Sequence, residues 1–269
     1  MIRAMDLPAG TWVGHLVLGA GEVGRALYKV LSDQYGEGED GVAIQDLGGS
    51  EVQANVLHIC YPYSQRHVQH KGCSTPDHLD SFVQSVQHYV QDHQDSVKSS
   101  GLVVVHSTVP VGTCDARGWV HSPVRGRHPQ LVDGLMSFVK HFGGERAAEA
   151  AEWFDACNIV TMIHDRARDT EAGKLWELVQ YGMQIRIEKA IHEWCERNGV
   201  SFKVAYTLFA ETYNNGYARR HPEFVRPVIA HMPGPIGGHC VRQASALLSH
   251  PLAELVSQGR LTGGLALPE

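Results

Sequence analysis

The chain has 269 residues, of which 43% are hydrophobic and 19% charged, and its formal net charge at pH 7 is −6. This length and composition fit a globular protein with a sizeable core, in one large domain or two smaller ones. The negative charge argues against binding to nucleic acid or to an anionic membrane surface, and no apolar run is long enough to span a bilayer.

The N-terminus lacks a basic segment followed by an apolar one, which is the pattern of a secretory signal. The six cysteines are scattered and form no C-x-x-C pair. We therefore expect a cytoplasmic protein with reduced thiols. The 17 histidines are spread along the chain without an H-E-x-x-H motif, so no metal site is predicted.

The first predicted element is a strand over 15–18, which leads into a G-x-G-x-x-G loop and then a helix over 25–31. In a dinucleotide-binding loop Gly19 permits the tight turn and Gly21 lets the backbone approach a pyrophosphate. Gly24 lets the helix pack closely on the strand, and the helix N-terminus faces the anion. The remaining candidate cofactor contacts in this loop are Glu22 and Val23.

A second predicted strand, 42–45, ends in Asp46, which lies 22 residues after Gly24. A carboxylate at this position accepts hydrogen bonds from a ribose diol, and it favours NAD over NADP because it repels a 2′-phosphate. S-adenosylmethionine also carries a ribose diol, so it is an alternative ligand. The other interpretation is a glycine turn in an α/β protein that binds no nucleotide.

The third predicted strand, 54–60, ends at Tyr61 and Pro62, which are further candidate cofactor contacts. Apolar runs continue to alternate with helical spacing up to about residue 165. This alternation predicts a Rossmann-type, doubly wound parallel sheet in a domain over 1–165. The other elements predicted in this domain are a helix over 76–97 and strands over 101–105, 119–120 and 158–163.

Two loops that follow predicted strands carry candidate ligand-binding residues. Ser107 and Thr108 come directly after the buried strand over 101–105, where hydroxyl groups face the ligand crevice of such sheets. The same residues also fit a capping turn. Arg125 and Arg127 suit a phosphate or carboxylate of an anionic substrate, unless they are ordinary solvated side chains.

Residues 166–269 are predicted to form a smaller, all-helical domain built on a long spine helix over 170–198. The apolar stripe of this helix is too extensive for one small domain to bury, which predicts a homodimer. Lys174 lies in its first turns, off the stripe, and is either an acid, base or charge clamp or an ordinary surface lysine. Asn214, in a long loop over 213–240, is a further candidate for substrate binding.

The glycine-rich end of that loop carries His239 and Cys240. A thiolate at the start of the next helix is favoured by the helix dipole, and a nearby histidine can assist it. This is the environment of a nucleophilic thiol. The alternative is an inert, buried thiol beside a glycine turn.

In sequence order, these segments resemble those of the UDP-glucose/GDP-mannose dehydrogenase family. The matching elements are the loop 19–24, S-T-V-P-V-G-T at 107–113, Ser122-Pro123, Lys174 and the G-G-H-C at 237–240. The resemblance covers about residues 15 to 250, and it implies an NAD-binding domain followed by a helical dimerisation domain. It also implies that Cys240 would capture an aldehyde, Thr108 would position water, and Lys174 would stabilise an oxyanion during two successive oxidations of a sugar-nucleotide alcohol.

Several positions depart from the family pattern. Val124 replaces the acid of S-P-E, Leu178 replaces an asparagine, and the lysine and aspartate expected after the cysteine are missing from 241–244. We also expect the family's C-terminal sugar-nucleotide domain to be absent. Loss of one acid or base typically costs roughly 10²–10⁴-fold in rate. These departures predict a single hydride transfer on a smaller substrate that is not a sugar nucleotide.

Two other classes of function fit the same residues. A methyltransferase using S-adenosylmethionine would keep the ribose-binding acid, but it would leave the pyrophosphate-binding part of the glycine loop without a partner. A non-catalytic dinucleotide-binding protein would keep the loop and the dimer helix while losing the chemistry of the cleft.

Overall fold

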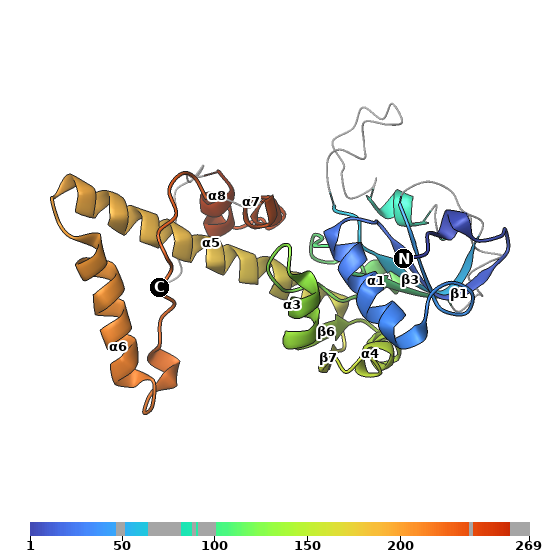
Figure 1. Cartoon of the computed structure of the whole chain (residues 1–269). Coiled ribbons are helices and arrows are strands. Elements are labelled where there is room, and N and C mark those ends of the chain that lie inside the picture. Colours follow the sequence, from blue (N-terminus) through green and yellow to red (C-terminus); the bar gives the residue numbers. More distant parts are fainter. Residues whose placement is uncertain (47–51, 64–81, 88–89, 91–100, 237–238, 259–269) are drawn as a thin grey trace. The chain divides into compact units, whose positions relative to one another are not determined.

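The computed structural model describes residues 1–46, 52–63, 82–87, 90, 101–236 and 239–258. The chain forms two compact units, Met1–Lys174 and Leu175–Glu269, which are considered separately below (Figure 1). The division falls inside one long helix, whereas the sequence predicts a boundary near residue 165, just before that helix begins.

The first unit is built on a seven-stranded sheet with the order β2-β1-β3-β4-β5-β6-β7. Among the described strands, only β5 and β6 pair antiparallel. The strands are β1 (Trp12–Leu18), β2 (Val42–Gln45), β3 (Gln53–Ile59), β4 (Leu102–Val105), β5 (Val120–His121), β6 (Lys140–Gly143) and β7 (Thr161–His164). The predicted Rossmann-type α/β fold is therefore confirmed.

The strands that the sequence predicts best are those with continuous apolar runs. Every residue of β2 and β4 is buried, as expected for parallel strands that are covered on both faces. β4 has the sequence Leu-Val-Val-Val, whose branched side chains suit an extended, pleated backbone.

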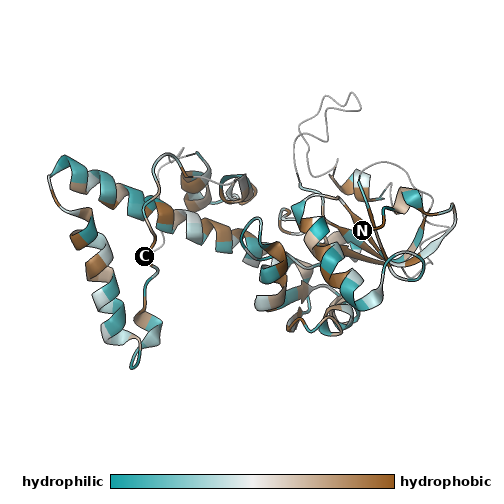
Figure 2. Cartoon of the chain, in the orientation of Figure 1, coloured by the Kyte–Doolittle hydropathy of each residue, from teal (hydrophilic) through white to brown (hydrophobic). Residues whose placement is uncertain are grey.

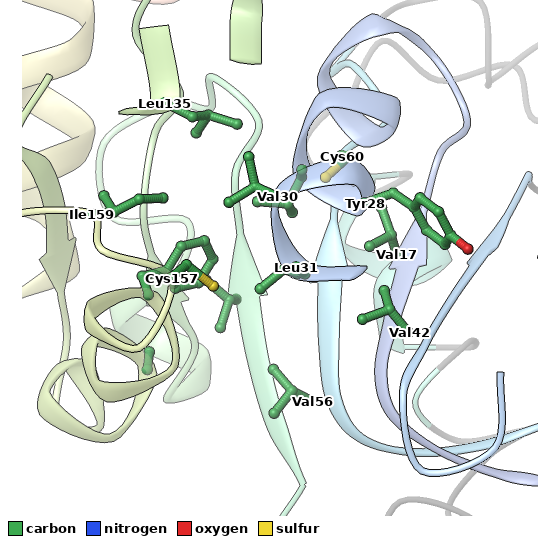
Figure 3. Packing of buried hydrophobic residues seen from close by; sticks show 14 of the residues in the cluster. Val17, Tyr28, Val30, Leu31, Val42, Val56, Cys60, Leu135, Cys157 and Ile159 are labelled. Atoms are coloured by element: carbon green, nitrogen blue, oxygen red, sulfur yellow. The ribbon is translucent and has the colours of Figure 1, made fainter. Parts of the chain in front are cut away.

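Helices cover both faces of the sheet. On one face α1 (Glu22–Tyr35), α3 (Leu131–Ser137) and α4 (Ala147–Asp155) pack on the strands. Figure 3 shows buried side chains of this face, among them Val30 and Leu31 of α1, Leu135 of α3 and Val56 of β3. The other face is covered by η1 (Ala4–Asp6), the helical residues 82–87 and the start of α5 (Ala167–Arg197).

Several elements of the first unit differ from the prediction. The sequence pattern misses α3, β6 and α4, and the short 3-10 turn η3 (Asp115–Arg117). α3 and β6 are too short to show a clear period, at seven and four residues. Most of the helix predicted over 76–97 lies outside the described residues; within it, 82–87 and 90 are helical.

The described residues of the second unit form helices and the loops that connect them, as predicted. The C-terminal part of α5 is followed by η4 (Lys203–Leu208, a π-helix), α6 (Phe209–Tyr217), η5 (Pro222–Phe224), α7 (His239–Ser245) and α8 (Pro251–Gln258). The long loop therefore begins after Tyr217 and not at Tyr213. A small core joins Val179 of α5 to α7 and α8, and a Cβ on Gly182 would lie 2.4 Å from Val256 Cγ1.

The apolar stripe of α5 is only partly buried within this chain. Val179 is 1% exposed, whereas Ile187 is 54% and Trp194 is 53% exposed. Figure 2 shows hydrophobic residues distributed along α5 and α6. Within the part of the chain that is described, no helix is both long and apolar enough to cross a lipid bilayer.

Candidate functional site: the glycine loop, the ends of the strands and the start of α5

The three glycines of the loop meet three different steric demands. Gly19 has a φ of +100°, and a Cβ there would lie 2.7 Å from the backbone nitrogen of Tyr61. A Cβ on Gly24 would lie 1.8 Å from the carbonyl oxygen of Gly19, so α1 packs directly on the turn. At Gly21, in contrast, a Cβ would meet nothing within 4 Å. The backbone at Gly21 therefore stays open to a ligand, as the dinucleotide motif requires.

The start of α1 has the properties of an anion site. Gly21 is its N-cap and offers no side chain to cap the helix, so among the described residues the first N–H groups remain for an external acceptor. Glu22 pairs with His128 on the surface, and Val23 packs against the core. Of these two loop residues, Glu22 thus presents its side chain to solvent and Val23 anchors the helix.

Asp46 lies beside the glycine loop, as the sequence predicts. The register of β1 and β2 pairs Leu18 with Gln45, which brings the residues after the two strands together. Asp46 Oδ1 accepts a hydrogen bond of 2.8 Å from the backbone N–H of Ala20, and the residue is exposed. Among the described residues, Asp46 Oδ2 has no hydrogen-bond partner, so it can accept a hydroxyl group of a ligand.

The ends of β3 and β4 are tied to each other. Ser107 Oγ donates a hydrogen bond of 2.6 Å to the carbonyl oxygen of Tyr61. The ring of Tyr61 is buried against Phe82, whereas Pro62 is exposed. Ser107 and Tyr61 therefore shape the floor of the glycine loop, and Pro62 lies at its surface.

The loop that carries Thr108 is fixed by a glutamate that the sequence reasoning missed. Glu171 of α5 is fully buried, and its carboxylate accepts hydrogen bonds from the backbone N–H groups of Gly112 (2.5 Å) and Cys114 (2.8 Å). Burial raises the pKa of Glu171, while the hydrogen bonds oppose that shift. Thr108 itself is half-buried. The sequence does indicate this position, because Glu171 lies four residues before Leu175 and so shares the buried face of the helix with it.

Lys174 lies one turn after Glu171 and is half-buried. His121, at the end of β5, is affected by its charge. Burial is the main cause that lowers the pKa of His121 to about 3, and the positive charges of Lys140 and Lys174 lower this pKa further. His121 is held by Thr170 Oγ1 at 2.8 Å and by the carbonyl oxygen of Ser107 at 3.2 Å. The start of α5 is thus joined to the ends of β4 and β5.

The two candidate arginines lie after β5. The guanidinium of Arg125 lies 5.0 Å from the ring centroid of Phe138, and Arg127 is exposed. Arg125 is therefore held by an aromatic face, whereas Arg127 projects into solvent.

The other candidate residues belong to the second unit. Cys240 is exposed and is the second residue of α7, which begins at His239. The side-chain amide of Asn214 makes two hydrogen bonds to the backbone of Arg226, at 2.7 and 2.9 Å. Asn214 thus fixes the segment after α6. Of the predicted site residues, the structure brings together the glycine loop, Asp46, Tyr61 and Ser107.

A buried row of histidines crosses the sheet and was not predicted. His15 Nδ1 lies 3.1 Å from His58 Nε2, and His58 Nδ1 lies 3.0 Å from His106 Nε2. Beyond them, Lys140 Nζ lies 3.3 Å from His106 Nδ1. All four side chains are at most 4% exposed. No sequence spacing reveals this row, because it follows the diagonal register of β1, β3 and β4.

The fold of this protein is found in solved structures of dehydrogenases. The chain aligns with a UDP-D-ManNAc dehydrogenase from Pyrococcus horikoshii at a TM-score of 0.67 and 18% identity, covering 92% of this chain and 68% of that one. A GDP-mannose dehydrogenase from Pseudomonas aeruginosa aligns at a TM-score of 0.57 and 13% identity, over 91% of this chain and 67% of that one. The protein therefore has a UDP-glucose/GDP-mannose dehydrogenase-like fold.

A 3-hydroxyisobutyrate dehydrogenase from Mycobacterium tuberculosis also aligns, at a TM-score of 0.59 and 14% identity. That alignment covers 92% of this chain and 91% of that one. The chain thus spans about two thirds of the length of the sugar-nucleotide enzymes above and nine tenths of the hydroxyacid enzyme. No family model and no curated protein matches the sequence.

The buried histidines predict that the fold is sensitive to acid. Burial lowers the pKa of His15 to about 4 and that of His121 to about 3, from an ordinary value of 6.5. Below pH 6.5 the unfolded chain therefore binds more protons at these two histidines than the folded chain does. Stability is unaffected by them above that pH, and it decreases as the pH falls toward 4. We expect the free energy of unfolding to drop by roughly 3 kcal/mol per pH unit below 6 for these two groups.

Urea denaturation of the whole chain at several pH values measures this slope. His121→Asn should reduce the slope of the unfolding free energy against pH by roughly half. His221→Asn, on the exposed surface, should leave this slope unchanged. An unfolding free energy that stays constant between pH 6 and 5 would contradict the prediction.

Proposed function

We propose that this protein is an oxidoreductase that binds a nicotinamide dinucleotide, with NAD preferred over NADP. The observation that carries the proposal is the open backbone at Gly21 between an uncapped helix N-terminus and the exposed Asp46. The dehydrogenase-like fold supports the same assignment. When it is bound, the nicotinamide supplies a hydride acceptor or donor.

Different residues around the glycine loop bind different parts of the dinucleotide. The N–H groups at the start of α1 hold the pyrophosphate, which approaches closely because Gly21 has no side chain. Asp46 accepts a hydrogen bond from a ribose hydroxyl through Oδ2, while Oδ1 stays fixed by Ala20. Its negative charge disfavours a 2′-phosphate, which is the basis of the preference for NAD.

Isothermal titration calorimetry with NAD⁺, NADP⁺ and S-adenosylmethionine tests this proposal. We expect wild-type protein to bind NAD⁺ most tightly. Gly21→Val should fold normally, because open space surrounds the new side chain, and it should weaken NAD⁺ binding by at least roughly tenfold because it blocks the pyrophosphate. Asp46→Asn should narrow the preference for NAD⁺ over NADP⁺.

Asp33→Asn is the matched control for the second variant, since Asp33 is an exposed acid on α1 that pairs with Lys29. Asp33→Asn should change neither the affinity for NAD⁺ nor the affinity for NADP⁺. Binding of S-adenosylmethionine without binding of NAD⁺ would overturn the proposal in favour of a methyltransferase.

For the substrate we propose a small anionic alcohol and not a sugar nucleotide. The departures at Val124 and Leu178 remove groups on which the double oxidation depends in the family that the sequence resembles. Arg125 and Arg127 offer positive charge for a carboxylate or phosphate. The near-complete alignment with a 3-hydroxyisobutyrate dehydrogenase makes small hydroxy acids the first class to test.

Lys174 is the residue we propose for acid–base chemistry or charge stabilisation in that reaction. It is half-buried and lies near the ends of β4 and β5, where a crevice forms in open α/β sheets. Cys240, with His239, is a second candidate for the reacting centre, because it is an exposed thiol at the start of α7.

Turnover of NAD⁺ with 3-hydroxyisobutyrate, L-serine, UDP-glucose and GDP-mannose tests the substrate class and the lysine together. We expect reduction of NAD⁺ with a hydroxy acid and none with the sugar nucleotides. Lys174→Met should lower kcat by roughly 10²–10⁴-fold, with NAD⁺ affinity unchanged. Lys29→Met, an exposed lysine of α1, serves as the control. Binding of NAD⁺ without turnover of any compound would favour a non-catalytic dinucleotide-binding protein.

We also propose that the protein is a homodimer held together through the long helix over 170–198. Ile187 and Trp194 on α5 and Phe209 on α6 are 54%, 53% and 70% exposed, which is a large apolar area for one chain to present to water. We expect a dimer in sedimentation velocity and a monomer for the double variant Ile187→Glu/Trp194→Glu. Glu193→Lys, a charge change between them on an exposed position, should remain dimeric. A monomeric wild type at micromolar concentration would reject the dimer.

A further inference from the structure

Arg125 lies between two residues that connect its loop to the start of α1. Val124 packs against the same buried cluster that Val23 of α1 borders. His128 Nδ1 pairs with the carboxylate of Glu22, the first residue of α1. The segment from Val124 to His128 therefore lies beside the proposed dinucleotide site, and Arg125 belongs to that segment.

The backbone next to Arg125 is held against α3 by two glycines. A Cβ on Gly126 would lie 3.0 Å from the Cα of Gly134, and a Cβ on Gly134 would lie 2.5 Å from the carbonyl oxygen of Arg125. Gly126 also has a φ of +138°, which residues with side chains rarely adopt. The loop and α3 thus approach each other more closely than larger residues allow, and this approach fixes the backbone of Arg125.

The side chain of Arg125 is held by Phe138, the residue that directly follows α3. Its guanidinium carbon lies 5.0 Å from the centroid of the phenyl ring. Such a contact uses the face of the guanidinium, whereas a carboxylate binds along its edge, where the N–H groups point. The ring therefore orients Arg125 without competing for the N–H groups that bind an anion.

Phe138 is apolar, yet 45% of it is exposed, so part of the ring is accessible to a ligand beside Arg125. Two other exposed apolar residues occur in the same region. Met136, at the end of α3, is 47% exposed, and Val160, whose carbonyl oxygen accepts a hydrogen bond from the first residue of β6, is 68% exposed. Exposed apolar side chains that gather beside a cation suit a ligand that is itself part anionic and part apolar.

The strand directions place Arg125 and Phe138 at the ligand-binding edge of the sheet. β6 runs antiparallel to β5, with Gly143 opposite His121, so the chain enters β6 from the side on which β5 ends. Phe138 comes just before that entry, and Arg125 comes just after the end of β5. Both residues therefore lie at the carboxyl edge of β5, which is the edge where ligands bind in open α/β sheets.

Lys174, the residue proposed for acid–base chemistry, is connected to the same edge. His121, the last residue of β5, contacts Thr170 Oγ1 through Nδ1 at 2.8 Å. Lys174 follows Thr170 by four residues on α5, so the two lie on the same face of that helix. Lys174, Arg125 and the glycine loop are thus all joined to the carboxyl ends of the strands.

We propose that Arg125 and Phe138 together recognise the substrate, and that this substrate is a hydroxy acid with an apolar group next to its carboxylate. The carboxylate pairs with the edge of the Arg125 guanidinium, and the apolar group lies on Phe138. This inference rests on the proposed oxidoreductase function, and it narrows the substrate from small anionic alcohols to amphipathic ones. A polar group in the same place would lose its water on the ring without gaining a hydrogen bond.

The expected preference follows from the apolar area that Phe138 offers. Complete burial of one methylene group changes a binding constant by about fourfold. Because the ring of Phe138 covers a bound group from one side only, a methyl group should gain about twofold and a phenyl group about tenfold.

Reduction of NAD⁺ with a series of 3-hydroxypropionates that differ only at carbon 2 measures this preference. The substituents are hydrogen, methyl, phenyl and hydroxyl, and every member keeps the carboxylate and the primary alcohol. We expect kcat/KM to rise about twofold from hydrogen to methyl and about tenfold from hydrogen to phenyl, and to fall for hydroxyl. Equal values across the series, or a preference for hydroxyl, would overturn the inference.

Two variants separate the roles of the ring and the cation. Phe138→Ser should reduce the ratio of kcat/KM between the phenyl and hydrogen compounds to about one. Arg125→Met should raise KM for every member by about the same factor and keep the ratio, because the carboxylate is common to all. Met5→Ser, at an exposed apolar residue of η1, should behave as wild type. A ratio that is unchanged in Phe138→Ser would also overturn the inference.

The affinity for unreactive acids provides a measurement that needs no turnover. In ligand titrations followed by NMR, 2-phenylpropionate should bind wild type about tenfold more tightly than propionate, and Phe138→Ser should abolish the difference. Equal affinities for the two acids in wild type would contradict the inference and leave the proposed function intact. Failure of the proposed function would appear instead as an absence of NAD⁺ binding in the calorimetric experiment above.

Discussion

The first unit depends on one close approach, that of α1 to the turn after β1. A side chain at Gly24 would overlap the carbonyl oxygen of Gly19, so the helix lies on the turn at a distance that only glycine allows. This contact aims the first N–H groups of α1 at the space above Gly21, and it places Asp46 beside them. The proposed anion site and the proposed ribose site therefore have one steric origin.

Two buried charged groups elsewhere in the first unit are held in different ways. Glu171 holds the loop of Thr108 with backbone hydrogen bonds, and among the described residues its fully buried carboxylate makes no ion pair. Lys140 has the opposite charge and lacks such a set of partners, because its contacts are one carbonyl oxygen and one imidazole. Glu171 thus fixes a loop through two backbone donors, whereas Lys140 is buried with fewer polar partners.

Much of the first unit can be predicted because its signals are local. The apolar runs of β2 and β4 indicate buried strands, and the spacing of Gly19, Gly21 and Gly24 indicates the turn and the helix that follow. The short elements α3 and β6 carry no such signal, since their positions depend on strands and helices distant in sequence. The antiparallel pairing of β5 with β6 likewise depends on contacts between elements and not on a local pattern.

By itself, the sequence determined the class of fold, the glycine loop and the acid that accompanies it, because these follow from backbone conformation and residue spacing. Only the tertiary structure decided which polar groups meet in the interior. The row from His15 to Lys140 joins residues that are 34 to 48 positions apart in the sequence, and Glu171 reaches a loop 57 residues earlier. Such contacts arise from the packing of whole elements, which no local pattern encodes.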